Sequence, residues 1–106
     1  MGTFLYGSYP LDSPSAPIKG KSVFVKITAG NDASSLVVYV AAGLAIDGSD
    51  ATELQSEISA TPTRVTLNAG QVANLAINGL TPGVVLVLKT AGGSGSASMM
   101  VQTAHD

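Results

Sequence analysis

The feature that most constrains the fold of this chain is a series of short runs in which apolar and polar residues alternate with a period of two. The run at residues 22–28 (SVFVKIT) places Val23, Val25 and Ile27 on one face, because successive side chains of a strand point to opposite sides. Turn-forming residues separate such runs at intervals of roughly ten residues. The pattern predicts about seven or eight short antiparallel strands.

The predicted fold class is therefore all-β, an antiparallel β-sandwich of either immunoglobulin-like or jelly-roll-like type with an extended N-terminal arm. Alternation selects the side chains that we expect in its core. The expected strands are 22–28, 36–41, 43–47, 64–68, 72–77, 84–88 and 97–103, and the expected core residues are Val25, Ile27, Val38, Val40, Val65, Leu67, Leu75, Ile77, Leu86 and Leu88.

Several local features refine this prediction. Residues 50–60 fit either a helix, since Asp50 and Glu53 form a capping-box pattern, or a charged edge strand, which the surrounding period favours. The alternation in 72–77 breaks near Asn74, which indicates a β-bulge. Thr81-Pro82-Gly83 predicts a type II turn, and the Gly/Ser-rich segment 92–96 predicts a flexible hairpin loop.

Residues 1–20 differ from the rest and form the predicted arm, while residues 21–106 form the predicted sandwich domain. Pro10, Pro14 and Pro17 favour extended backbone. The arm also contains three of the five aromatic residues. Such a segment should dock on something, either the sandwich of its own chain or a neighbouring subunit. We expect the partner-binding residues to be Phe4, Leu5, Tyr6 and Tyr9.

Composition excludes several classes of function. Charged residues make up 11% of the 106 positions and the net charge is −2, so no clustered basic face is expected to bind nucleic acid. No apolar run reaches the roughly 20 residues of a membrane span, and the N-terminus lacks the layout of a signal peptide. A surface poor in charge is typical of protein–protein interfaces, where Lys and Glu are depleted.

The residue types that carry chemistry are scarce. The chain has no cysteine, and its one histidine, His105, is next to the last residue, where a catalytic base is poorly held. Asp47, Asp50, Glu53 and Glu57 form the only charge cluster, but they lack the ligand spacing of an EF-hand. We therefore expect no catalytic residue, no metal, no cofactor and no small-molecule substrate, and hence no enzyme.

Residues 79–88 (GLTPGVVLVL), the following Gly/Ser loop and residues 99–103 resemble the end of fibronectin type III and related immunoglobulin-like domains. In that family a Leu-x-Pro-Gly turn leads into a central strand, although Leu86 stands where the family has a tyrosine and the chain has no tryptophan. This resemblance implies a sandwich.

In size, composition and layout the chain also resembles the small decoration (cement) proteins of tailed-phage capsids. That likeness implies a structural role on the virion surface, with the major capsid protein or other structural subunits and copies of the chain itself as partners. The alternative function is a carbohydrate- or receptor-binding module, such as an adhesin or tail-fibre domain, located outside the cell or on its surface.

Overall fold

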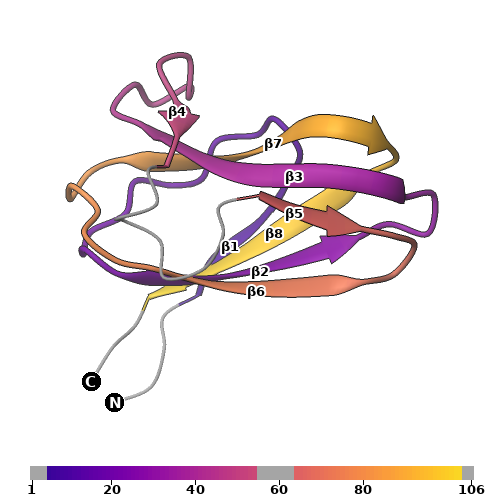
Figure 1. The fold of residues 1–106 in the computed structure, drawn as a ribbon. Helices are drawn as coiled ribbons and strands as arrows, with labels where there is room; N and C mark the ends of the chain where they lie inside the picture. The colour runs from indigo at the N-terminus through magenta and orange to yellow at the C-terminus, as the bar shows by residue number, and fades with distance from the viewer. Residues whose placement is uncertain (1–4, 55–63, 104–106) are drawn as a thin grey trace.

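The computed structural model describes residues 5–54 and 64–103 and contains two antiparallel sheets packed face to face (Figure 1). Sheet A has the strand order β1-β8-β2-β6. In sheet B, β7 pairs along one edge of β3, while β4 and β5 pair with successive stretches of its other edge. The strands are β1 Leu5–Pro10, β2 Val23–Ala29, β3 Ser34–Gly43, β4 Thr52–Glu53, β5 Arg64–Leu67, β6 Val72–Ile77, β7 Val85–Ser94 and β8 Ala97–Thr103.

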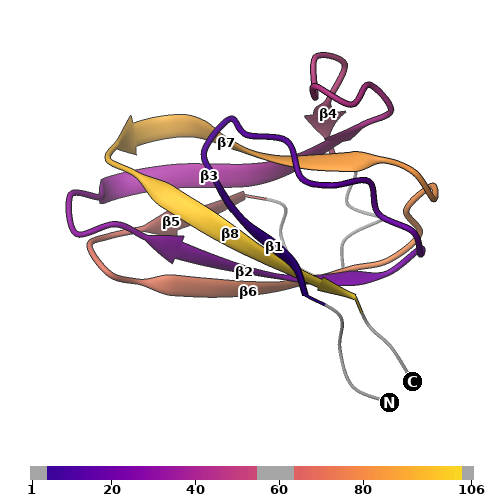
Figure 2. The same cartoon turned by 180° about the vertical axis from the view of Figure 1, so that it is seen from behind.

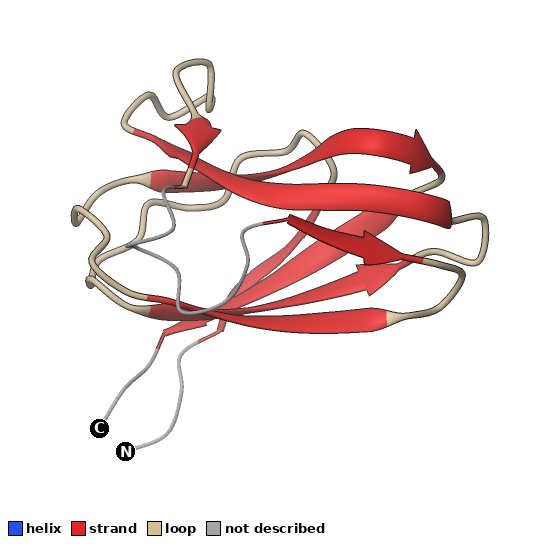
Figure 3. Ribbon diagram, in the orientation of Figure 1, coloured by secondary structure: helices blue, strands red, loops and turns tan. Residues whose placement is uncertain are grey.

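The all-β sandwich predicted from the alternation is confirmed, and the described part of the chain contains strands and loops but no helix (Figure 3). The inward-facing side chains of both sheets form one core. Val65 is half-buried and packs against that core, and every other predicted core residue is buried. The Thr81–Gly83 turn is also confirmed, since Val84 N–H donates to Thr81 C=O and Gly83 has a φ of 97°.

Two predicted strand features are wrong. Of residues 43–47, Gly43 is the last residue of β3 and residues 44–47 form a loop rather than a further strand. β6 pairs with β2 in unbroken register from Val23–Ile77 to Thr28–Val72, without a bulge. The alternation of β6 is hidden because Ala73 takes an inward position while Val72 faces outward. Of the ambiguous residues 50–60, Thr52–Glu53 form β4, and residues 55–60 lie outside the described residues.

The N-terminal segment closes the free edge of β7. After β1 pairs with β8, the chain crosses to sheet B and residues 11–18 run beside β7 (Figure 2). The N–H groups of Asp12, Ser15 and Ile18 donate to the carbonyl oxygens of Leu88, Leu86 and Val84, at 2.8 Å each. With this segment counted as an edge strand, the two sheets have the strand order of a jelly roll.

The Gly/Ser-rich segment is a tight corner and not a flexible hairpin loop. It joins β7 to β8, which belong to different sheets, and β7 itself extends to Ser94. At Gly93, where φ is 74°, a side chain would collide with the backbone of Ser35 and Leu36. Asp32 ties the same corner to the β2–β3 loop by accepting hydrogen bonds from both Ser96 N–H and Ser96 Oγ. Close backbone approach therefore explains why this corner is rich in glycine.

Candidate interaction surfaces

The four residues predicted to bind a partner are distributed over the start of sheet A. Phe4 lies outside the described residues, and Leu5 and Tyr6 belong to β1. Tyr9 is half-buried and packs against the core of its own chain, and its hydroxyl oxygen accepts a hydrogen bond from Ala16 N–H at 3.3 Å. The sequence left open whether the aromatic residues of the arm dock on their own sandwich or on a neighbouring subunit. Tyr9 docks on its own sandwich. A partner-binding role for the four residues stays a prediction.

The rest of the predicted arm is also built into the sandwich. Ser15 is 5% exposed, and its Oγ accepts a hydrogen bond from Leu86 N–H while donating one to Ala16 C=O. Ile18 is fully buried in the core. The described residues therefore show no separation between an arm that ends at residue 20 and a sandwich that begins at residue 21.

The outer face of sheet B is covered by the chain itself. Ala41, Val85 and Val87 are at most 3% exposed although they lie on the side of β3 and β7 that faces away from the core. The β3–β4 loop folds over them: a β-carbon at Gly48 would lie 2.8 Å from Val87 Cγ2 and 3.4 Å from Pro14 Cβ. The loop and the N-terminal segment together form this second apolar layer.

Hydrogen bonds from two carboxylates hold the β3–β4 loop in one shape. Asp50 accepts from the backbone N–H groups of Leu44 and Ala45, at 3.1 and 2.9 Å, and Asp47 accepts from Ser49 N–H at 3.0 Å. These bonds favour the ionised form and lower the pKa of both Asp47 and Asp50. Two members of the predicted charge cluster, Asp47 and Asp50, are thus engaged in shaping the loop.

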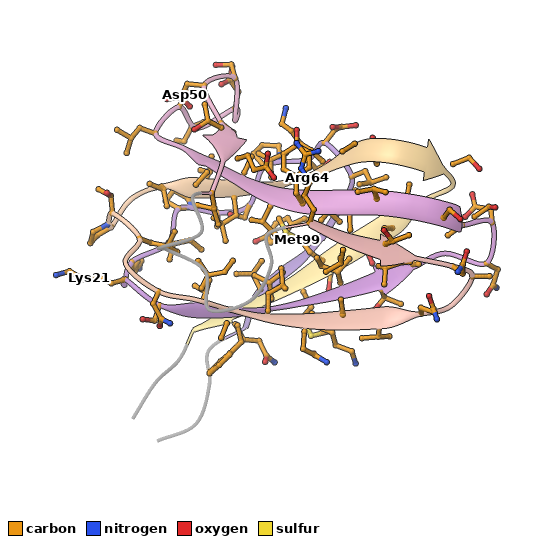
Figure 4. The ribbon with its side chains drawn as sticks, in the orientation of Figure 1. Lys21, Asp50, Arg64 and Met99 are labelled. Atoms are coloured by element: carbon orange, nitrogen blue, oxygen red, sulfur yellow. The ribbon has the colours of Figure 1, made fainter. Side chains whose placement is uncertain are left out.

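The same loop exposes two large aliphatic side chains. Leu44 is 66% exposed and Ile46 is 77% exposed, the highest values among the large hydrophobic residues of the described chain. Figure 4 shows this loop, marked by Asp50, standing away from sheet A. We call Leu44, Ile46 and Asp47 the loop tip. Because the hydrogen bonds of Asp50 define the loop, its tip is presented without the entropy cost of ordering a flexible segment.

No described segment covers the outer face of sheet A, in contrast to that of sheet B. Among its described side chains Lys26 is the only charged one, and Phe24 and Val72 are 46% and 44% exposed. The centre of this face forms an open hollow of about 660 Å³. It is lined mainly by two cross-strand rows, which contain Phe24, Ala76 and Gln102 and then Lys26, Asn74 and Met100.

One cluster of charged and aromatic groups lies on sheet B. The Arg64 guanidinium makes a bidentate ion pair with Glu53, at 2.7 and 2.8 Å, and lies 5.0 Å from the centroid of the Tyr39 ring. The carboxylate of Glu53 raises the pKa of Arg64. These contacts tie β3, β4 and β5 together at the surface, a structural role that needs no ligand.

The described residues contain no cluster of three or more His, Asp or Glu side chains that could hold a metal ion. Glu57 and His105 lie outside the described residues. In residues 5–54 and 64–103 there is no helix with the length and apolar character that crossing a membrane requires.

Comparison with known proteins found no matching family model, no matching curated protein and no matching solved structure. The arguments for function therefore come from the surfaces described above.

Sequence reasoning missed the loop tip. The residues Gly43 to Asp47 alternate as a strand does, and this period hid the loop. The sequence does contain an indication of this loop. Gly43 and Gly48 stand on either side of Leu44 and Ile46, and Asp50 follows as an acceptor for backbone N–H groups of the loop. Two apolar side chains between turn residues are compatible with an exposed apolar loop and with a short strand alike.

Proposed function

We propose that this protein is a structural assembly subunit that works through protein–protein contacts, most concretely a decoration (cement) protein of a phage capsid. In that role it binds the major capsid protein and stabilises the shell by bridging neighbouring subunits. Its place is then the outer surface of the virion.

The observation that carries the proposal is the presence of apolar groups at two places on the surface of a well-packed sandwich. The loop tip and the outer face of sheet A expose Leu44, Ile46, Phe24 and Val72. Exposed apolar groups with few charges around them are typical of surfaces that another protein covers. Repetition on a symmetric shell multiplies weak contacts of this kind by avidity.

The start of the chain supplies the attachment in this proposal. Leu5 and Tyr6 belong to β1, the edge strand of sheet A, and Phe4 precedes them in the sequence. Aromatic residues are enriched among the few that dominate interface energy. An unpaired strand edge beside them also offers main-chain hydrogen bonds to a partner.

Co-sedimentation with empty shells, assembled from the major capsid protein encoded by the same genome, tests the proposal. The full chain should pellet with the shells at a saturating stoichiometry set by the shell symmetry. A chain lacking residues 1–4 keeps every described strand and should lose at least about tenfold in affinity. Absence of saturable binding by the full chain would refute the proposed function.

The alternative, a carbohydrate-binding module, is favoured by one observation. Phe24 is exposed in the hollow of sheet A beside the polar groups of Asn74 and Gln102, and sugar sites combine an exposed aromatic ring with nearby polar groups. Titration with a panel of oligosaccharides, followed by NMR shifts of the hollow residues, would detect this activity. Shell binding without any saturable sugar response would decide for the structural role.

A further inference from the structure

The loop tip and the hollow of sheet A are complementary in chemistry. The tip presents two aliphatic side chains, Leu44 and Ile46, followed directly by the acidic Asp47. The hollow presents apolar surface from Phe24 and Met100 together with a single cation, Lys26.

Volume and charge both allow the tip to enter the hollow. A cavity of about 150 Å³ holds a benzene ring, so a hollow of about 660 Å³ has room for two aliphatic side chains. Among the described residues, the one salt bridge joins Arg64 to Glu53, so neither Lys26 nor Asp47 is paired there. In a contact between tip and hollow, Asp47 would meet Lys26 at the edge, and the apolar side chains would be buried at the centre. A polar edge around an apolar centre is the usual arrangement of a protein interface.

Within one molecule this contact is excluded by geometry. The β3–β4 loop lies on the outer side of sheet B, whereas the hollow lies on the outer side of sheet A, at the opposite face of the sandwich (Figures 1 and 4). The tip can therefore reach a hollow only on another copy. Each such contact leaves one tip and one hollow open, so the association is head-to-tail and continues to a ring or an open chain.

We propose that a second copy of this chain occupies the hollow of sheet A, inserting Leu44 and Ile46 against Phe24 and Met100 and placing Asp47 beside Lys26. This inference rests on the proposed function in one respect, since it names the contact by which adjacent subunits are joined. It does not require the shell, because the contact can form in solution.

Sedimentation velocity of the purified full chain, over a concentration series up to about 1 mM, measures this contact. The expected result is growth beyond the dimer as concentration rises, because a head-to-tail contact does not stop at two. A monomer at every concentration would overturn the inference. So would a dimer that does not grow further.

Variants on both sides of the contact identify the residues. The tip variant Leu44→Ser/Ile46→Ser and the hollow variant Phe24→Ser should each weaken association by about tenfold or more, the loss expected for a buried apolar anchor. The matched control is Val72→Ser. Val72 lies on the same face as Phe24 and is nearly as exposed, but it does not line the hollow. Melting temperatures confirm that each variant is folded. Wild-type association by either the tip or the hollow variant would contradict the proposal.

A mixture of the tip variant and the hollow variant distinguishes head-to-tail from symmetric association. The tip variant keeps an intact hollow and the hollow variant keeps an intact tip, so the mixture should form 1:1 dimers and nothing larger. A symmetric contact between two tips would give no dimer between the two variants. The hollow variant would instead associate with itself as the wild type does, and this result would refute the proposal.

Charge exchange tests the pairing of Asp47 with Lys26. Asp47→Lys and Lys26→Asp should each weaken association about two- to fivefold or more, the range of a partly exposed ion pair with added repulsion. Both changes in one chain should restore it, and failure to restore would remove the ion pair from the model of the contact. Self-association without shell binding would refute the proposed function alone, whereas shell binding by a strictly monomeric chain would refute this inference alone.

Discussion

The two sheets of this sandwich differ in what covers their outer faces. Outside sheet B, the β3–β4 loop and Pro14 cover Ala41, Val85 and Val87. Outside sheet A, Phe24 and Val72 stay about half exposed. Among the described residues, irregular segments thus cover the outer face of sheet B, whereas the outer face of sheet A stays exposed. An apolar strand position is therefore no guide to burial until the covering segment is known.

The largest expected effect comes from removing β1, the edge strand of sheet A. Deletion of residues 1–10 removes β1 and Tyr9 and releases the segment that covers β7. We expect a loss of at least about 3 kcal/mol in the free energy of unfolding, or no cooperative fold, since a half-buried aromatic and a whole strand pairing are lost. Urea denaturation measures this. Deletion of residues 1–4 is the control and should leave stability nearly unchanged.

A substitution at Gly48 should break the cover of sheet B. Gly48→Ala combines a left-handed φ of 73° with a β-carbon 2.8 Å from Val87 Cγ2, so we expect a cost of about 2–4 kcal/mol. Gly79→Ala is the matched control, because Gly79 has a φ of 75° but nothing within 4 Å of its added β-carbon. It should cost about 1–2 kcal/mol from strain alone. Equal melting temperatures for the two variants would show that the loop does not press on Val87.

Two valines compare the outer faces directly. Val87 on sheet B is 3% exposed and Val72 on sheet A is 44% exposed. Truncation of a fully buried valine removes about 1.5–3 kcal/mol of stability before relaxation, so Val87→Ala should cost about 2 kcal/mol and Val72→Ala less than about 1 kcal/mol. Chemical denaturation of both variants measures the difference. A larger loss for Val72→Ala would reverse the comparison.

The smallest expected effect is the acid sensitivity of the covering loop. Backbone hydrogen bonds from Ala45 and Leu44 hold the pKa of Asp50 below its usual value of 3.8. The unfolded chain therefore takes up this proton at higher pH than the folded chain does. The contribution to stability is complete above about pH 5 and is lost as pH falls through the folded pKa.

The melting temperature of the wild type should thus decline below about pH 4, and Asp50→Asn should flatten that decline. Asp32 and Asp47 also have lowered pKa values, so the slope should diminish without vanishing. An unchanged slope in Asp50→Asn would mean that Asp50 does not hold the loop when the protein is in solution.

The sequence by itself determined the inward faces of most strands, because period-two alternation follows directly from the geometry of a strand. Val25 and Ile27 needed no further information to be assigned to a core. The turn at Thr81–Gly83 was equally predictable from the sequence. Proline restricts φ to the value needed at the second turn position, and glycine permits the positive φ needed at the third. Both features depend only on residues that are neighbours in the chain, so they can be predicted from the sequence.

Only the tertiary structure decided which segments cover which surfaces. Residues 11–18 lie beside β7 because its main-chain groups need partners there, and Ser15 supplies one with its side chain. The corner at Gly93 is rich in glycine because the backbone of Ser35 passes close to it, a contact made by residues far apart in the chain. The loop tip is exposed because Asp50 folds the loop onto Val87 and leaves Leu44 and Ile46 outside. Each of these outcomes depends on long-range approach between segments, which no local pattern of residues encodes.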